Sequence, residues 1–287
     1  PQNGHDLVTT IDVNIQDVAE KAMRKMLTSL DGTEIGIAMV MEVATGDIKA
    51  IVNLSRSNDG KFYEMKNNAV SDLMEPGSTF KTASIMVGLE DGKIKKNETV
   101  DCTGGTYPMH GRTMRDHNWR KGGYGTLTVS EILEQSSNIG VSRLIDRAYH
   151  NSPQKYVDGL KDLGVGVPLD LPFVGKGEPI IPQPNSKKRY WSKTDLAWMS
   201  IGYVTQLTPI HTLTFYNGIA NNGRMVKPRF VKAEKDNGIV VREFPTEVIR
   251  EKMCSQHTLD DIHDILEKVV SKGLGKRAGN GGKLFKV

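Results

Sequence analysis

The stretch Glu75-Pro76-Gly77-Ser78-Thr79-Phe80-Lys81-Thr82-Ala83 decides how the rest of the chain is interpreted. A Pro-Gly turn leads Ser78 into the first turn of a predicted amphipathic helix. Residues three apart lie on one helix face, so the Ser78 hydroxyl and the Lys81 ammonium can meet. A serine beside a lysine that can lose its proton is one known form of activated acyl-transfer nucleophile. Taken alone, the pattern also fits an ordinary helix start with a serine cap and a solvated lysine.

The same S-x-x-K spacing recurs at Ser152-Pro153-Gln154-Lys155. There, a capping serine followed by proline at the first helical position explains the residues fully. A chemical role for Ser78 therefore needs support from elsewhere in the chain.

Such support comes from Ser136-Ser137-Asn138, which falls in the break between two predicted helices. A loop at that break can direct a hydroxyl and an amide into a cleft. The plain alternative is that Ser137 or Asn138 only caps the second helix.

Composition excludes several classes of protein. The 287 residues are 38% hydrophobic and 25% charged, with a net charge of +4, which fits a globular protein. No dense run of Lys or Arg predicts nucleic-acid binding, and no apolar stretch approaches the roughly 18 residues of a membrane span. His110 and His117 lie seven apart, but no third ligand completes a recognised metal pattern. We therefore predict that these are loop histidines and not metal ligands.

Hydrophobic periodicity and turn signals give a coarse secondary structure. Predicted strands cover residues 6–11, 35–43, 48–54, 225–233, 239–244 and, at the C-terminus, 283–287. Predicted helices cover residues 14–30, 78–89, 128–135, 138–149, 152–163, 195–201, 208–223 and a last helix capped by Thr258. Residues 55–73 read as a surface loop. Because strands occupy the two ends and helices fill the middle, the pattern favours an α+β fold.

The first helix, from Asn14 to Leu30, carries a candidate buried face. Its apolar residues recur every four positions, and Asp12 stands where a cap is expected. The predicted face consists of Val18, Ala22, Met26 and Leu30.

The motifs S-x-x-K and S-x-N, in this order, match the signature of penicilloyl-serine transferases. From about residue 4 to the C-terminus, the chain resembles the transpeptidase domain of class B penicillin-binding proteins. Further family-like segments are Thr45-Gly46, Leu127-Thr128-Val129, Ser200-Ile201-Gly202-Tyr203, Thr208-Pro209 and Ile219-Ala220-Asn221-Asn222-Gly223. The resemblance implies one transpeptidase domain over residues 1–287 with a β-lactamase/transpeptidase-like fold. In that fold, helices flank an antiparallel sheet and a second subdomain is mostly helical.

The resemblance also implies an activity. It is a D,D-transpeptidase that cross-links peptidoglycan stem peptides through an acyl-enzyme, and β-lactams acylate the same serine. No metal or organic cofactor is implied. Residue by residue, Ser78 is the nucleophile, Lys81 the general base and Ser136 the proton shuttle, while Asn138 holds the substrate and Lys81. The Ser-Ser-Asn form of the second motif looks like the cell-division branch, so septal wall synthesis is expected.

One family element is absent from the printed sequence. The third motif, Lys-Thr-Gly or Lys-Ser-Gly, does not occur, although Gly282 to Val287 resembles the start of the strand that carries it. We expect the chain to stop a few residues short of that motif, which would limit its activity, and to lack an upstream anchor helix and pedestal. By resemblance, the whole protein is membrane-anchored, with an extracytoplasmic (periplasmic) catalytic domain. A membrane glycosyltransferase and other division proteins are its expected partners.

Two other functions share this fold. A serine β-lactamase hydrolyses the same acyl-enzyme, but it needs a dedicated deacylating base, and no convincing Glu or carbamylated-Lys context occurs here. A non-catalytic penicillin-sensing domain keeps the fold without cross-linking. Turnover of a chromogenic cephalosporin identifies the first, and a cross-linking assay separates the second.

Overall fold

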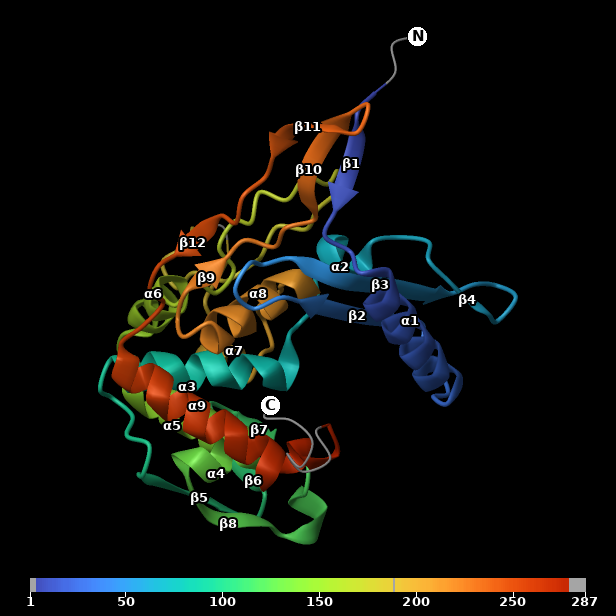
Figure 1. The fold of residues 1–287 in the computed structure, drawn as a ribbon. Coiled ribbons are helices and arrows are strands. Elements are labelled where there is room, and N and C mark those ends of the chain that lie inside the picture. Colours follow the sequence, from blue (N-terminus) through green and yellow to red (C-terminus); the bar gives the residue numbers. More distant parts are fainter. Residues whose placement is uncertain (1–3, 188, 279–287) are drawn as a thin grey trace. The chain divides into compact units, whose positions relative to one another are not determined.

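A computed structural model describes residues 4–187 and 189–278 of the chain (Figure 1). It combines helices with antiparallel strand pairs, which confirms the predicted α+β class. The chain forms two compact units, each assembled from three separate stretches. The first unit comprises Pro1–Met74, Val167–Pro179 and Leu207–Met253, and the second comprises Glu75–Gly166, Ile180–Gln206 and Cys254–Val287. No described helix has the length and apolar character needed to cross a membrane.

The first unit contains three small antiparallel sheets. One has the order β1 (Asp6–Thr9), β10 (Val231–Asp236), β11 (Ile239–Glu243), and another has the order β2 (Ile35–Met41), β3 (Ile48–Arg56), β4 (Phe62–Tyr63). The third pairs β9 (Met225–Val226) with β12 (Val248–Arg250). The predicted strands over residues 35–43 and 48–54 pair as β2 and β3. The predicted strand over residues 225–233 is wrong in extent, because it divides into β9, which pairs with β12, and β10, which pairs with β11. Asn237 and Gly238 form the turn between β10 and β11 with φ angles of 48° and 84°. Two positive φ angles are what a two-residue hairpin loop requires.

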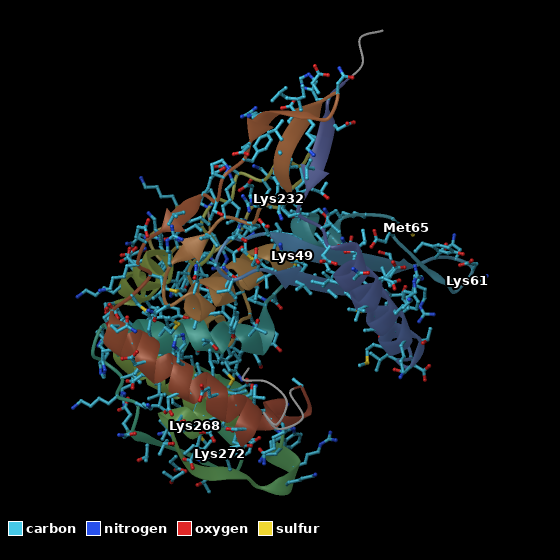
Figure 2. All side chains as sticks on the ribbon, in the orientation of Figure 1. Lys49, Lys61, Met65, Lys232, Lys268 and Lys272 are labelled. Carbon is cyan, nitrogen blue, oxygen red and sulfur yellow. The ribbon has the colours of Figure 1, made fainter. Side chains whose placement is uncertain are left out.

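A buried carboxylate closes the turn between β2 and β3. Asp47 is 1% exposed, and its oxygens lie 2.5 Å from Arg229 Nε, 3.1 Å from Lys49 Nζ and 3.3 Å from Lys232 Nζ. Figure 2 labels both lysines. Burial raises the pKa of Asp47, but the hydrogen bonds from these cations outweigh it and leave that pKa below its ordinary value. The negative charge of the buried Asp47 is thus balanced by the three cations that contact it.

Helix α1 (Val13–Thr28) begins where the sequence predicts, with Asp12 accepting the backbone N–H groups of residues 14 and 15. Its predicted buried face is wrong by one residue. Val18 and Met26 are 68% and 56% exposed, whereas Leu27 is 2% exposed. The buried stripe, packed on the β-sheet of β2 and β3, consists of Ala19, Met23 and Leu27. Both sets recur every four residues, and Gly36 selects between them, because its missing Cβ leaves the room that the side chains of 23 and 27 fill.

The predicted surface loop over residues 55–73 is wrong at both ends, although residues 58–61 and 63–66 are exposed. Strand β3 continues to Arg56, β4 follows, and the one-turn helix α2 (Asn68–Ser71) buries Asn68, Ala69 and Val70. The buried amide of Asn53 accepts a hydrogen bond from the backbone N–H of Ala69, at 2.8 Å. Asn53 on β3 thus anchors the backbone of α2, whereas residues 58–61 and 63–66 face water.

Helix α8 (Pro209–Ala220) completes the first unit and begins with the predicted Thr208-Pro209. It carries His211, which is 7% exposed and whose Nδ1 lies 2.6 Å from the Thr208 hydroxyl. Burial lowers the pKa of His211 to about 4.

The second unit is mostly helical. Its helices are α3 (Lys81–Glu90), α4 (Val129–Glu134), α5 (Asn138–Tyr149), α6 (Pro153–Asp162), α7 (Asp195–Met199) and α9 (Gln256–Ser271), with short 3-10 turns at Gly77–Phe80, Trp119–Lys121 and Leu274–Arg277. Two antiparallel pairs join β5 (Thr99–Thr103) to β8 (Gly123–Thr128) and β6 (Thr106–Met109) to β7 (Arg112–Arg115). Helix α3 packs against α5, α6 and α9, and Figure 1 shows α3 and α9 side by side.

Two local predictions for this unit need correction. Helix α3 is not amphipathic, since every residue from Lys81 to Gly88 is buried by the three helices around it. The last helix is capped by Ser255, whose hydroxyl accepts the backbone N–H of Thr258, so Thr258 itself is not the cap. The predicted strand at residues 283–287 lies outside the described residues.

Candidate active site

Ser78 is exposed and lies in the 3-10 turn Gly77–Phe80, which continues directly into α3. The turn depends on two glycines. Gly77 has a φ of 56°, and its N–H donates to the carbonyl of Gly202 at 3.0 Å. A Cβ on Gly202 would lie 1.9 Å from the Gly77 carbonyl oxygen. The close contact of these two backbones therefore fixes the approach to Ser78.

Lys81, one helical turn after Ser78, is 1% exposed. Its ammonium donates to the Ser136 carbonyl at 2.6 Å and to the Ser136 hydroxyl at 3.0 Å. Burial lowers the pKa of Lys81 to about 8, against an opposing effect of the Asp116 charge. A lysine with such a pKa exists partly as the neutral amine near neutral pH and can accept a proton.

Ser136 has a strained backbone. Helix α4 ends in a Schellman motif, in which the N–H of Ser137 reaches the Ile132 carbonyl at 2.8 Å and the N–H of Ser136 reaches the Leu133 carbonyl at 3.1 Å. Ser136 occupies the left-handed position of this motif with a φ of 52°, where glycine is the usual residue. A serine at such a position indicates that its hydroxyl has a use that outweighs the strain.

Ser137 caps α5, as predicted, and its side chain contacts Asp116, for which we made no prediction from the sequence. Its hydroxyl accepts the N–H of Gly140 and donates to the carboxylate of Asp116, at 3.0 and 2.9 Å from the two oxygens. Asp116 is 1% exposed and also accepts the N–H of Ile139, at 3.0 Å. This buried carboxylate thus holds the loop and the first turn of α5 together.

Asn138 is half-buried at the start of α5, and its side-chain amide donates to the carbonyl of Arg115 at 2.8 Å. In the described part of the chain, both hydrogen bonds of the Lys81 ammonium go to Ser136. The structure therefore brings Lys81 and Ser136 together, whereas the Asn138–Lys81 hydrogen bond stays a prediction.

The second S-x-x-K pattern is a helix start, as predicted. Ser152 occupies the N-cap position of α6, although its side chain makes no cap hydrogen bond, and Pro153 occupies the first helical position. The region expected to approach the third motif, residues 282–287, lies outside the described residues.

Comparison with known proteins agrees with this geometry. Residues 36–286 match the family described as "Penicillin binding protein transpeptidase domain". The chain is 29% identical over 263 residues to "Probable peptidoglycan D,D-transpeptidase PenA" of Neisseria flavescens, covering 89% of this chain and 62% of that protein. It is 27% identical over 254 residues to "Peptidoglycan D,D-transpeptidase FtsI" of Escherichia coli, covering 87% of this chain and 41% of FtsI.

Among solved structures, apo penicillin-binding protein 3 of Mycobacterium tuberculosis is similar with a TM-score of 0.78 and 26% identity, over 95% of this chain and 60% of that one. A peptidoglycan glycosyltransferase from Burkholderia ambifaria is similar with a TM-score of 0.75 and 25% identity, over 94% and 77% of the two chains. The chain spans 41 to 62% of the length of the first curated relatives that it matches. On its sequence match and its fold, this chain belongs to the penicillin-binding protein transpeptidase family.

Proposed function

We propose that this chain is the catalytic domain of a division-type peptidoglycan D,D-transpeptidase that acts through an acyl-enzyme on Ser78. The observation that carries the proposal is the buried ammonium of Lys81, which bonds the Ser136 hydroxyl and has a pKa lowered to about 8. The names of the PenA and FtsI relatives support the reaction class, and FtsI supports the division branch.

In the first half-reaction, the Ser78 Oγ attacks the carbonyl carbon between the two terminal D-alanines of a stem peptide. The Ser78 proton passes to the neutral amine of Lys81. The C–N bond then breaks, Ser136 relays a proton from Lys81 to the departing amine, and D-alanine leaves. Asn138 holds the peptide, and the backbone N–H of Ser78 donates to the developing oxyanion.

In the second half-reaction, the amine of another stem peptide attacks the ester carbonyl. Its proton returns through Ser136 and Lys81 to the Ser78 oxygen, and the new amide is the cross-link. A β-lactam enters the first step in the same way, and its opened ring stays attached to the serine. A related M. tuberculosis structure is described as a complex with ampicillin, which supports β-lactam binding in this family.

The membrane setting is part of the proposal. The catalytic domain would face the outside of the cell membrane, anchored by a helix outside this chain. Its partners would be a membrane glycosyltransferase and other division proteins.

Intact-mass measurement after incubation with penicillin tests the proposal on the natural gene product. We expect one penicilloyl adduct in the wild type and none in Ser78→Ala, whereas Ser152→Ala, the matched control, gains the adduct normally. An adduct in Ser78→Ala refutes the nucleophile. Adduct formation without cross-linking of lipid-linked peptidoglycan favours a sensing domain, and rapid adduct loss favours a β-lactamase.

A further inference from the structure

Two histidines and an aspartate meet in the second unit, outside the proposed active site. His110 Nε2 lies 2.7 Å from Asp146 Oδ1, and His150 Nδ1 lies 3.4 Å from the same oxygen. One ligand atom from each residue lies within 4.8 Å of those of the other two. We propose that His110, Asp146 and His150 bind a divalent transition-metal ion of the Zn²⁺ class.

The backbone directs all three side chains to one point. Asp146 and His150 are four residues apart at the C-terminal end of α5, so they lie on one face of that helix. His110 comes from the turn between β6 and β7, where it and Gly111 have φ angles of 49° and 83°. The rings of His110 and His150 stack with centroids 5.1 Å apart and planes 7° apart. Both imidazoles therefore present a nitrogen to the same carboxylate.

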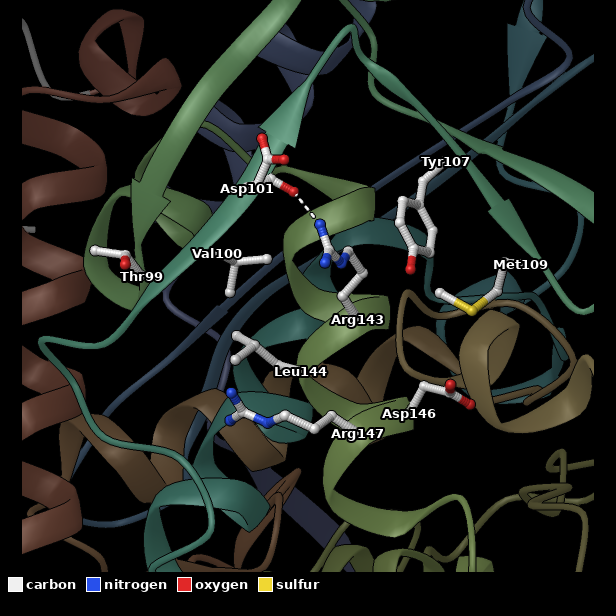
Figure 3. A pocket seen from close by; sticks show the side chains of 9 residues that line it. All are labelled: Thr99, Val100, Asp101, Tyr107, Met109, Arg143, Leu144, Asp146 and Arg147. Carbon is white, nitrogen blue, oxygen red and sulfur yellow. Dashed lines mark hydrogen bonds between the residues drawn. The ribbon is translucent and has the colours of Figure 1, made fainter.

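The neighbouring cations do not compete for this carboxylate. Arg147 pairs with Glu98 at 2.9 Å, and Arg143 donates to the Asp101 carbonyl. Figure 3 shows Asp146 on the side of α5 away from Arg147 and close to Met109. Within the described residues, the side-chain partners of the Asp146 carboxylate are the two imidazoles. The C-terminal end of a helix further favours a positive ion.

The ligand atoms suit zinc. Imidazole nitrogen and carboxylate oxygen are common zinc ligands, and bonds of about 2.0–2.1 Å in a tetrahedral site place neighbouring ligand atoms about 3.4 Å apart. The side chain of His150 is 54% exposed, so water can supply a fourth ligand. On binding, neutral His110 coordinates through Nε2 and keeps its proton on Nδ1, whereas neutral His150 coordinates through Nδ1 and keeps its proton on Nε2.

The expected effect of the ion is structural. It would fasten the β6–β7 hairpin, which leads directly to Asp116, onto α5, which begins at Asn138. His117, the histidine that the sequence pairs with His110, is not part of the cluster, since its Nε2 lies 2.9 Å from the Tyr124 hydroxyl. The two ligands that join His110 are Asp146 and His150, which lie at the end of α5, 36 or more residues further along the chain.

The test titrates this 287-residue chain, carrying a histidine-free purification tag, with Zn²⁺ by calorimetry and with Co²⁺ by visible absorption. We expect one ion per chain, a tetrahedral Co²⁺ spectrum, and a rise in Tm of about 5 °C at Zn²⁺ concentrations 100 times the Kd. His150→Gln and Asp146→Asn should each weaken binding at least about 10-fold. Unchanged circular dichroism of the metal-free variants shows that they still fold.

His257→Gln is the matched control. His257 and Asp261 have the same four-residue spacing on α9, at 3.8 Å, but Lys96 lies 3.2 Å from that aspartate. This variant should bind Zn²⁺ as the wild type does. Absence of the Co²⁺ spectrum, wild-type affinity in both cluster variants, or an equal loss in His257→Gln would each overturn the proposal.

Discussion

The proposed role of Lys81 makes the rate of acylation depend on pH in a defined way. The reactive form is the neutral amine, because only that form can take the proton of Ser78. With a pKa of about 8, about 20% of Lys81 is neutral at pH 7.4, whereas a lysine with the ordinary pKa of about 10.4 would be about 0.1% neutral. Burial of this side chain thus raises the reactive fraction about 200-fold.

The acylation rate should follow this fraction. Below pH 8 it should rise about 10-fold per pH unit, level off above pH 8, and differ about 90-fold between pH 6 and pH 9. The assay is the second-order rate constant for labelling by a fluorescent penicillin at constant ionic strength, with Ser78→Ala as the background. Lys81→Arg keeps the charge but cannot give up its proton, so it should lose about 10²–10⁴-fold at every pH.

Lys155→Ala serves as the matched control, because Lys155 has the same spacing from a serine but lies on α6. Its profile should coincide with that of the wild type. A rate independent of pH between 6 and 9, or a midpoint near the ordinary lysine value, would refute the assignment of Lys81 as the base.

Four other expectations follow from the structure. Ser136→Gly should keep or raise thermal stability, because glycine suits the left-handed position, while acylation falls about 10²-fold or more; a stable variant with full activity would contradict the shuttle role. Gly202→Ala should lower Tm and slow acylation together, since its methyl group overlaps the backbone that precedes the nucleophile; normal acylation would contradict this. Asp116→Asn should move the midpoint of the pH profile of Lys81 to lower pH, because it removes the negative charge that raises this pKa; a midpoint at higher pH would contradict it. His211 has a folded pKa of about 4, so the unfolded state binds its proton more tightly, and the free energy of unfolding should fall by about 3 kcal/mol in total as pH falls from about 6.5 to 4. Urea unfolding of the wild type and His211→Gln at pH 7.5 and 5 measures this loss, and equal losses in the two proteins would exclude His211 as the cause.

Local signals explain what the sequence could predict. The Thr128–Glu131 capping box and the Ser137 cap set the starts of α4 and α5, and both helices begin where expected. The roles expected for Lys81 and Ser136 came from the family resemblance, because each residue belongs to one of its short motifs. The hydrogen bond between their side chains emerged only from the structure.

Features that depend on contacts between residues far apart in the sequence could not be predicted. The buried face of α1 was displaced by one residue, since Gly36, and not the helix pattern, selects the stripe that packs. Asp116 carries no local pattern, because its importance comes from Ser137, 21 residues later. The left-handed backbone conformation of Ser136 could not be predicted either, because a serine in the sequence does not indicate a positive φ.

The pairing of β1 with β10 has a consequence for how the chain folds during synthesis. Asp6 to Thr9 pair with residues 231 to 235, so the partner of this early strand is translated more than two hundred residues later. At about 5–20 residues per second, a ribosome needs about 10–45 s to cover that distance. Until then, both edges of the nascent β1 offer unpaired backbone groups to any other strand. Pairing of β1 is therefore a late step, which can be completed only after residues 231 to 235 have been synthesised.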